Sequence, residues 1–297
     1  MRKNILGKSL VLSTLLFSTS YASEKNFIEL GLGLSDSLNS FNYQDNVNDK
    51  TKSNTSSFTS IQFAYNLELD DKKNAYAKML YGQMNLGLTY ILDKGKLDLG
   101  FSVDLGAQNE WRDPFNTVEN EGESEVSEKG IYIGYSLPLT QNIYSTFKYT
   151  RTYKEYEDDQ VHADLKRDGT KQNIRMENMY KNYLVNFNYE IYDANGKSSS
   201  YKILEFEGGK VYTLSKKMTL IALGNIGTIK YDETNPVLNE QIDGTIYGAK
   251  FNLKYKEPYS FKNSYISVVT GYEKTQANNS FYDKKNKVGM VSIGYTF

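Results

Sequence analysis

Alternation of apolar and polar residues runs through most of this chain and restricts it to a β structure. The clearest stretches are KLDLGFSVDLGA (Lys96 to Ala107), NYLVNFNYEIY (Asn182 to Tyr192) and TIYGAKFNLKY (Thr245 to Tyr255). Because successive side chains of a strand point to opposite faces, each stretch has one apolar and one polar face. No helical period of comparable length occurs. Strands of about ten residues with this pattern are typical of transmembrane barrels.

The first residues indicate export from the cytoplasm. MRKNILGKSLVLSTLLFSTSYAS begins with basic residues, continues with an apolar run from Leu10 to Phe17, and has small residues up to Ala22. This is the layout of a secretory signal cleaved after Ala22. An uncleaved anchor helix is disfavoured, because a membrane span needs about 20 apolar residues. We therefore predict a signal peptide over residues 1–22 and a single domain over residues 23–297.

The composition excludes several classes of protein. The chain has 35 basic and 36 acidic residues, and removal of a signal with three basic residues leaves 32 against 36, a net charge of −4. This mild acidity argues against a nucleic-acid partner. With no cysteine, the chain has neither disulfides nor a thiolate nucleophile. An exported β protein of this kind is either secreted or a barrel of an outer membrane.

The number of strands can be predicted because a membrane barrel has short turns on its periplasmic side and longer loops on its extracellular side. Simple inspection gives twelve strands, but twelve would place the long acidic stretch Gln108 to Ser127 on the periplasmic side, where turns are short. Ala75 to Leu92 and Asn173 to Tyr192 are each about twice the spanning length. Hairpins near Gly82 and Lys181 remove both problems. We predict an all-β fold, a transmembrane antiparallel β-barrel of fourteen strands, with twelve as the alternative.

The chain ends on GMVSIGYTF, in which Val291, Ile293, Tyr295 and Phe297 alternate with small or polar residues. In a closed barrel the last strand pairs with the first, so these four side chains would face lipid. A terminal aromatic residue after alternating apolar residues resembles the membrane-insertion signal that outer-membrane assembly machinery reads. The alternative is a soluble strand that happens to end there. The pattern predicts a bacterial outer-membrane protein whose partners are the membrane lipids and the barrel-assembly machinery.

The polar face of each strand would line the lumen of such a barrel. Fourteen strands leave a wider lumen than eight, which side chains just fill. Because both charge signs occur on this face, we expect weak ion selectivity. The alternative is that the charged residues only form salt bridges that brace the wall. The predicted pore-lining residues are Asp98, Asp104, Lys148, Asn186, Asn188, Lys250, Asn252 and Lys254.

Several stretches carry a family resemblance. They are FIELGLGLSDSLNSFNY near the start, EWRDPF (Glu110 to Phe115), DANGKSSSY (Asp193 to Tyr201), NPVLN (Asn235 to Asn239), SYISVVTGYE (Ser264 to Glu273) and FYDKKNKVGMVSIGYTF (Phe281 to Phe297). Together they resemble the OmpL-type porin family, which is catalogued as a domain of unknown function. The resemblance implies an outer-membrane porin in which DANGK caps an outer loop. This chain departs from the family in its third and fourth strands, which look shortened, and in the weakly patterned stretch Asn173 to Lys181.

The resulting prediction is a porin for passive diffusion of small hydrophilic solutes and ions, with no enzymatic activity, cofactor or metal. One alternative is a surface adhesin or receptor that uses the acidic stretch Gln108 to Glu128, although a charge run is usually only solvated. The other is an outer-membrane hydrolase built on His162, the only histidine, which has Asp164 nearby but no serine nucleophile in its neighbourhood. No phosphate loop, zinc spacing or EF-hand pattern occurs.

Overall fold

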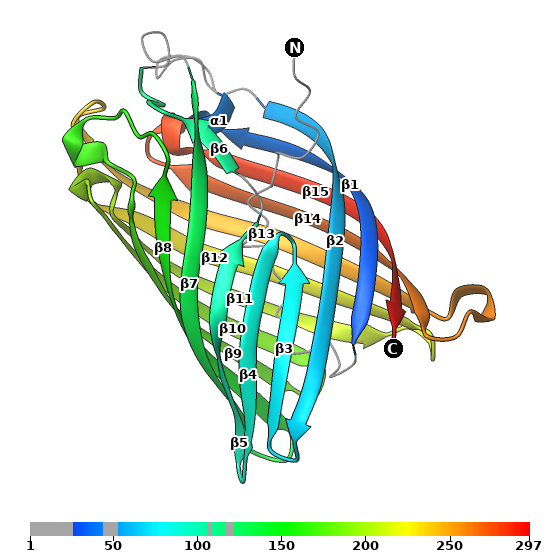
Figure 1. Cartoon of the computed structure of the whole chain (residues 1–297). Coiled ribbons are helices and arrows are strands. Elements are labelled where there is room, and N and C mark those ends of the chain that lie inside the picture. The colour runs from blue at the N-terminus through cyan, green and yellow to red at the C-terminus, as the bar shows by residue number, and fades with distance from the viewer. Residues whose placement is uncertain (1–25, 44–52, 106–107, 117–121) are drawn as a thin grey trace.

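The strands of the chain close into an antiparallel barrel, as a computed structural model of residues 26–43, 53–105, 108–116 and 122–297 shows (Figure 1). The predicted signal peptide lies outside the described residues. The strands are β1 (Phe27–Asn39), β2 (Ser53–Asp70), β3 (Lys73–Leu80), β4 (Gln83–Leu92), β5 (Gly95–Asp104), β6 (Gln108–Trp111), β7 (Glu123–Pro138), β8 (Ile143–Tyr156), β9 (Gly169–Tyr180), β10 (Tyr183–Ala194), β11 (Tyr201–Thr213), β12 (Met218–Asn235), β13 (Glu240–Lys256), β14 (Ser264–Ala277) and β15 (Lys284–Thr296).

The helices are short and lie in the connections. They are α1 (Ser40–Tyr43), η3 (Ala163–Leu165), η4 (Lys197–Ser199), η5 (Pro258–Ser260) and η6 (Ser280–Tyr282). Among the described residues, no helix has the length and apolar content that crossing a membrane requires.

The barrel has fourteen strands, because β5 and β6 together form one of them. Both pair with β7: residues 96–103 of β5 lie opposite 129–136, and residues 108–111 of β6 lie opposite 123–126. The chain therefore continues along one line beside β7 after a short break. The prediction of fourteen strands is confirmed, and the alternative of twelve is excluded.

Closure joins the first strand to the last. β1 and β15 pair along their whole length, from Phe27 opposite Thr296 to Asn39 opposite Lys284. The backbone N–H and C=O groups of β1 and β15 can therefore hydrogen-bond to each other along this seam, as strands that face lipid must do. Val291, Ile293, Tyr295 and Phe297 all lie exposed on the outside of the seam, as the alternation predicts.

The two predicted hairpins are present. A two-residue turn at Tyr81 and Gly82, both with positive φ, joins β3 to β4, and a turn at Lys181 joins β9 to β10. Positive φ at both central residues suits the right-handed twist of the flanking strands. β3 and β4 are short strands, with 8 and 10 residues against 18 for β2. The weakly patterned stretch before Lys181 belongs to β9, which pairs with both neighbours.

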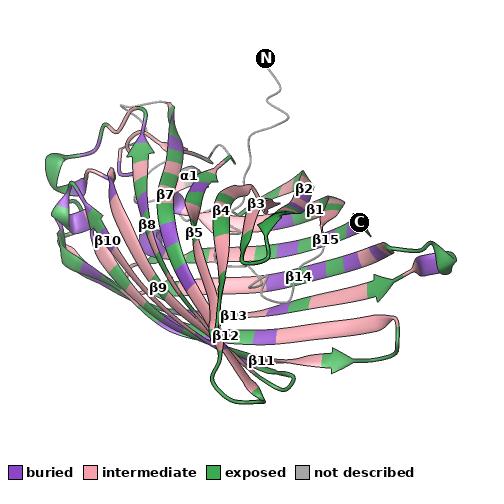
Figure 2. Cartoon of the chain, turned by 60° about the horizontal axis from the view of Figure 1, so that its bottom comes forward, coloured by how far each residue is buried: buried purple, intermediate pink, exposed green. Residues whose placement is uncertain are grey.

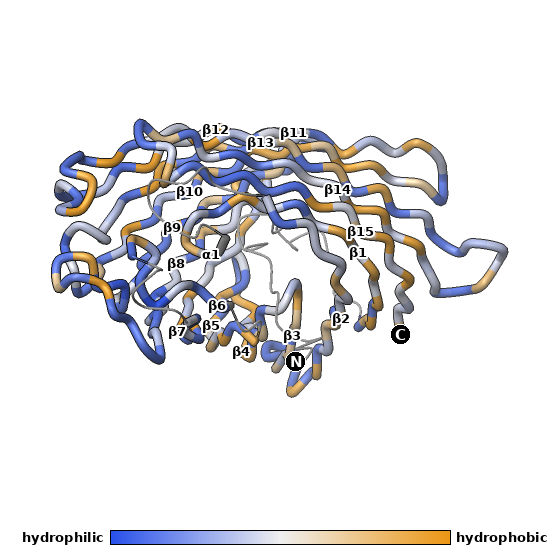
Figure 3. Tube along the Cα trace, turned by 90° about the horizontal axis from the view of Figure 1, so that it is seen from above, coloured by the Kyte–Doolittle hydropathy of each residue, from blue (hydrophilic) through white to orange (hydrophobic). Residues whose placement is uncertain are grey.

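The apolar face of nearly every strand points outward. Leu32, Phe101 and Ile226 are 69%, 66% and 62% exposed, and exposed residues alternate with buried ones along the strands (Figure 2). Coloured by hydropathy, the strands show the same alternation (Figure 3). Soluble monomers rarely expose an apolar surface of more than a few hundred Å². The outer wall therefore fits a hydrocarbon environment.

Long and short connections lie at opposite ends of the barrel. At one end most connections are brief, as at residues 71–72, 93–94 and 181–182, although 257–263 is longer. At the other end most are longer, including 112–122 and 157–168. Barrels of outer membranes keep their longer loops on the extracellular side. We call this the outer end, and it agrees with the sides predicted from the sequence.

Candidate functional site: the lumen and its outer end

All eight residues predicted to line the pore lie on the inward face of the wall. Asp98, Lys148 and Asn188 each lie between outward-facing neighbours, and the same holds for Lys250, Asn252 and Lys254 on β13. Asp104 lies opposite Gln83, next to the β3–β4 turn. The structure groups them into separate patches around the wall, because they come from β5, β8, β10 and β13.

Lys250 belongs to a buried polar network rather than to a free surface. Its Nζ donates to Glu207 Oε2 at 2.9 Å, and Asn186 Nδ2 donates to Glu207 Oε1 at 2.7 Å. Lys250 is only 2% exposed, and the guanidinium of Arg175 lies 3.9 Å from the same carboxylate. For Lys250 and Asn186 the alternative of wall bracing therefore describes the contacts better than a free pore-lining role.

Asp98 and Lys148 belong to a second patch of the inward face, which also contains Tyr76 and Tyr132. Thr89 donates to Asp98 Oδ1 at 2.5 Å, and the Nζ of Lys148 lies 4.3 Å from the centre of the Tyr132 ring. The hydroxyls of Tyr76 and Tyr132 are 2.5 Å apart. The ring of Tyr76 lies over Gly87, and that of Tyr132 lies over Gly100, where a Cβ would collide with them. Glycine at these positions gives the aromatic rings their space.

The remaining predicted residues make weaker contacts. Asn173 donates to Asn188 at 2.8 Å, and Ser267 donates to Asn252 at 3.1 Å. The Nζ of Lys254 lies 3.5 Å from the centre of the Tyr265 ring, and Tyr265 donates to Glu29 at 2.7 Å. Asn188, Asn252 and Lys254 are half-buried, as are Asp98, Asp104 and Lys148.

Sequence reasoning missed two acidic residues of the wall. Glu205 and Glu207 are buried on the inward face of β11, where Glu205 accepts a hydrogen bond of 2.6 Å from Asn225. Their signal was present in LEFEGG (Leu204 to Gly209), because two glutamates alternate there with Leu204 and Phe206. Alternation gives the face of each glutamate but not its partner, which comes from another strand.

An aromatic cluster, which we call the outer cap, lies at the outer end of the barrel. Loop residues pack there on Tyr231 and Ile242, which point inward from β12 and β13. The Phe115 and Phe281 rings stack with centroids 4.9 Å apart, and Tyr231 meets Tyr282 edge-on at 4.9 Å. The cap consists of Phe41, Phe115, Val161, Leu165, Tyr231, Ile242, Phe281 and Tyr282.

A charged network lies beside the cap and is centred on Arg167. The guanidinium donates to Asp159 Oδ1 at 2.7 Å and 3.0 Å, and to the carbonyl oxygens of Trp111 and Arg112 at 2.8 Å and 2.9 Å. It also lies 3.4 Å from Glu110 Oε2. Arg167 is 5% exposed. Glu110 therefore belongs to a buried network, so for this residue the interpretation of the acidic stretch as a solvated run was wrong.

Three motifs behind the family resemblance build this outer end. In NPVLN, the buried amide of Asn235 donates to Tyr282 at 2.9 Å and accepts from the backbone of Val237 at 2.9 Å. In DANGK, a Cβ on Gly196 would lie 2.3 Å from the nitrogen of Lys166, so only glycine lets these two outer loops touch. In EWRDPF, Glu110 and Phe115 join the charged network and the cap. The expected position of DANGK in an outer loop agrees with the structure.

His162 lies exposed in the connection between β8 and β9. Its side chain is 63% exposed, and its Nδ1 lies 3.6 Å from Asp164 at the start of η3. Within the described part of the chain, no group of three or more histidine, cysteine or acidic residues is placed to hold a metal ion.

From the surroundings of Glu110 we expect the stability of the outer end to depend on pH. Burial would raise the pKa of Glu110, but Lys154 and Arg167, with a 2.8 Å hydrogen bond from Tyr156, lower it from 4.5 to about 2. Because the folded pKa lies below the unfolded one, this carboxylate stabilises the outer end above about pH 4.5. That stabilisation is lost as the pH falls towards 2.

We expect the fluorescence of Trp111, the only tryptophan, to report this loss as a transition between about pH 4.5 and 2. Glu110→Gln should abolish or displace the transition. Glu125→Gln, at an exposed position of β7, is the matched control and should leave it in place. An unchanged transition in the Glu110 variant would show that another group is responsible.

Comparisons with known proteins agree with this architecture. A family model described as "Protein of unknown function (DUF2860)" matches residues 18–296. No curated protein matches the chain. Among solved structures, the CymD monoaromatic hydrocarbon channel aligns with a TM-score of 0.52 at 7% identity, covering 97% of this chain and 93% of that one.

Two further solved structures are similar. A Pseudomonas aeruginosa FadL homologue has a TM-score of 0.51 at 10% identity, with coverage of 92% and 91%. A TodX deltaS2S3 mutant, described as a monoaromatic hydrocarbon channel, has a TM-score of 0.51 at 12% identity, with coverage of 94% and 92%. At these identities the likeness shows a shared barrel fold.

Proposed function

The chain belongs to the family described as protein of unknown function (DUF2860), and we propose that within it this chain is a bacterial outer-membrane channel. It passes small hydrophilic solutes and ions by passive diffusion. The observation that carries this proposal is the inward face, where amide, hydroxyl and charged groups such as Asn188, Asn252 and Lys254 replace the apolar side chains of the outside.

Two physical arguments support this function. A barrel of fourteen strands is wider than one that its own side chains fill. Polar groups around a lumen compensate a solute for the water it loses on entry. The proposal includes an outer-membrane location, contact of the apolar wall with lipid, and recognition of the terminal Val291, Ile293, Tyr295 and Phe297 by the assembly machinery.

Single-channel recording in a planar lipid bilayer tests the proposal. We expect stable current steps with weak ion selectivity, because the inward face carries both signs of charge. Lys254→Glu reverses a charge on this face and should shift the reversal potential in a salt gradient towards cation selectivity. Lys210→Glu, on the outward face of β11, is the matched control and should leave it unchanged. Correctly folded protein that carries no current would refute the proposal.

A second candidate is a channel for small apolar molecules. On the inward face, Phe58 and Tyr81 pack against buried Val288 and form an apolar patch beside the β3–β4 turn. The CymD and TodX structures are described as hydrocarbon channels. Proteoliposome swelling separates the two candidates. Swelling in arabinose favours the hydrophilic channel, whereas toluene uptake without swelling in arabinose favours the apolar one.

A further inference from the structure

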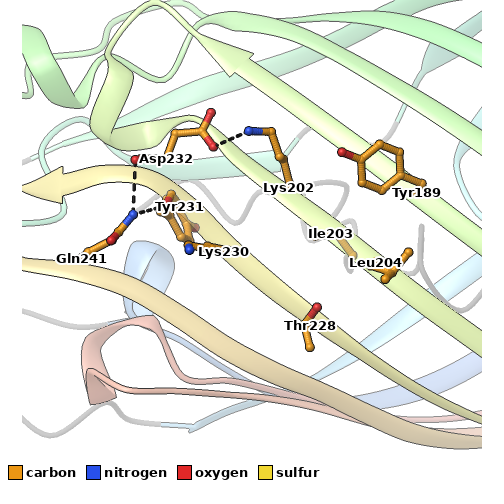
Figure 4. Close-up of a pocket in the computed structure, with 9 residues that line it drawn as sticks. All are labelled: Tyr189, Lys202, Ile203, Leu204, Thr228, Lys230, Tyr231, Asp232 and Gln241. Carbon is orange, nitrogen blue, oxygen red and sulfur yellow. Dashed lines mark hydrogen bonds and ion pairs between the residues drawn. The ribbon is translucent and has the colours of Figure 1, made fainter.

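A cavity of about 390 Å³ lies on the outer surface of the barrel, where β11 and β12 reach the outer end. Lys202, Lys230 and Asp232 stand around its polar side, and Leu204 and Thr228 form the side towards the middle of the wall (Figure 4). The cavity therefore joins a charged rim to the apolar band. It lies on the lipid-facing side of the wall, outside the lumen.

A β-bulge builds the polar side of this cavity. The register between β12 and β13 shifts between Lys230 and Thr234. The side-chain amide of Gln241 lies beside this bulge and donates to the carbonyl oxygens of Tyr231 at 3.0 Å and Asp232 at 3.2 Å (Figure 4). Bulges redirect side chains at the rims of barrels. Here the bulged backbone is held by specific hydrogen bonds, so the cavity is preformed.

Among the residues that line the cavity, Lys202 and Lys230 stand against one acidic residue, Asp232, while Asp243 lies opposite Lys230 on β13 and is not part of the lining. Lys202 and Lys230 lie directly opposite each other on neighbouring strands, an arrangement that destabilises a sheet when both side chains carry the same charge. Asp232 accepts a hydrogen bond of 2.9 Å from Lys202. The side chain of Lys230 makes no hydrogen bond or ion pair with the residues that the structure describes. Two lysines against one aspartate leave room for an anion.

We propose that this cavity binds the phosphate group of an anionic glycolipid in the outer leaflet. The two lysines hold the phosphate, while the acyl chain runs over Leu204, Phe206 and Ile226, which are exposed below the cavity. Lysines at a membrane surface attract anionic lipid headgroups in this way. A soluble anion would leave this apolar side of the cavity without a partner. The proposal depends on the orientation of the barrel and not on whether the lumen conducts.

Native mass spectrometry of the detergent-purified protein, with the phosphorylated glycolipid lipid A as the probe, tests this site. Replacing both lysines in a Lys202→Gln, Lys230→Gln variant should weaken binding about thirtyfold, and Lys230→Gln alone about fivefold. Lys210→Gln, an outward lysine at the other end of β11, is the matched control and should bind like the native protein. Current through the lumen should be the same in all variants.

Two further probes identify the source of the phosphate. Lipid A without its phosphates should bind at least tenfold more weakly than the phosphorylated form, and inorganic phosphate alone should not bind measurably. Equal binding of both lipids, or no effect of the lysine replacements, would overturn the proposal. Lysine-dependent binding of inorganic phosphate at the affinity of the glycolipid would assign the cavity to a soluble anion instead. If the double variant does not fold, Lys230→Gln decides the question by itself.

Discussion

Replacing Arg167 by alanine is expected to lower the free energy of unfolding by about 3 to 5 kcal/mol. The guanidinium is buried between Asp159, Glu110 and two backbone carbonyl oxygens, and it lies 4.3 Å from the centre of the Tyr156 ring. Its removal takes the cation at 2.7 Å from the buried carboxylate of Asp159 and leaves Glu110 with Lys154 as its neighbouring cation. The loss should be concentrated at the outer end, because every contact of Arg167 is made there.

Urea unfolding of the protein folded in lipid vesicles measures this effect. Arg112→Ala is the control, because Arg112 forms a 3.2 Å ion pair with Asp158 in which both side chains are more than one-third exposed. Such exposed pairs contribute about 0 to 1 kcal/mol. A loss below about 1 kcal/mol for Arg167→Ala would mean that water or rearranged side chains replace the guanidinium, and that the network does not hold the loops.

A second large effect is expected at Phe101 on the outside of β5. Phe101→Arg should lower the free energy of unfolding of the protein in vesicles by about 2 to 4 kcal/mol, because a charged side chain would enter the apolar band. Phe101 lies opposite Leu86 on one side and Ile131 on the other, so no polar partner is near. The fraction folded as a function of urea measures the change.

Thr55→Arg is the matched control for this experiment. Thr55 also points outward, but it lies opposite Asp36 near the outer end of β2, beyond the apolar residues of that strand. There an arginine is expected to change stability by no more than about 0.5 kcal/mol. Equal losses at Phe101 and Thr55 would contradict the assignment of the apolar face to lipid.

Much of the wall could be predicted from the sequence because its signal is local. Alternation assigned Phe251 to the outside and Asn252 to the inside, and the length of each stretch located the turns at Gly82 and Lys181. Stretch length and sidedness together also gave the strand number. These predictions can be made without knowing which strands are neighbours in the barrel.

The partners of the inward side chains could not be predicted in this way. Lys250 reaches Glu207 across the intervening strand β12, and the two residues are 43 positions apart in the sequence. Their meeting depends on the register of two separate strand pairs. A residue expected to face open water is therefore paired and buried.

The outer end shows the same limit more strongly. EWRDPF, DANGK and NPVLN were visible as separate motifs, yet only the fold brings Glu110 to Arg167, 57 residues away, and Asn235 to Tyr282. The sequence by itself determined that this chain is a barrel with an apolar outside and a polar inside, because side-chain direction in a strand repeats every two residues. Only the tertiary structure decided that the outer loops meet in one buried cluster, because such contacts depend on where closure of the whole wall places each loop.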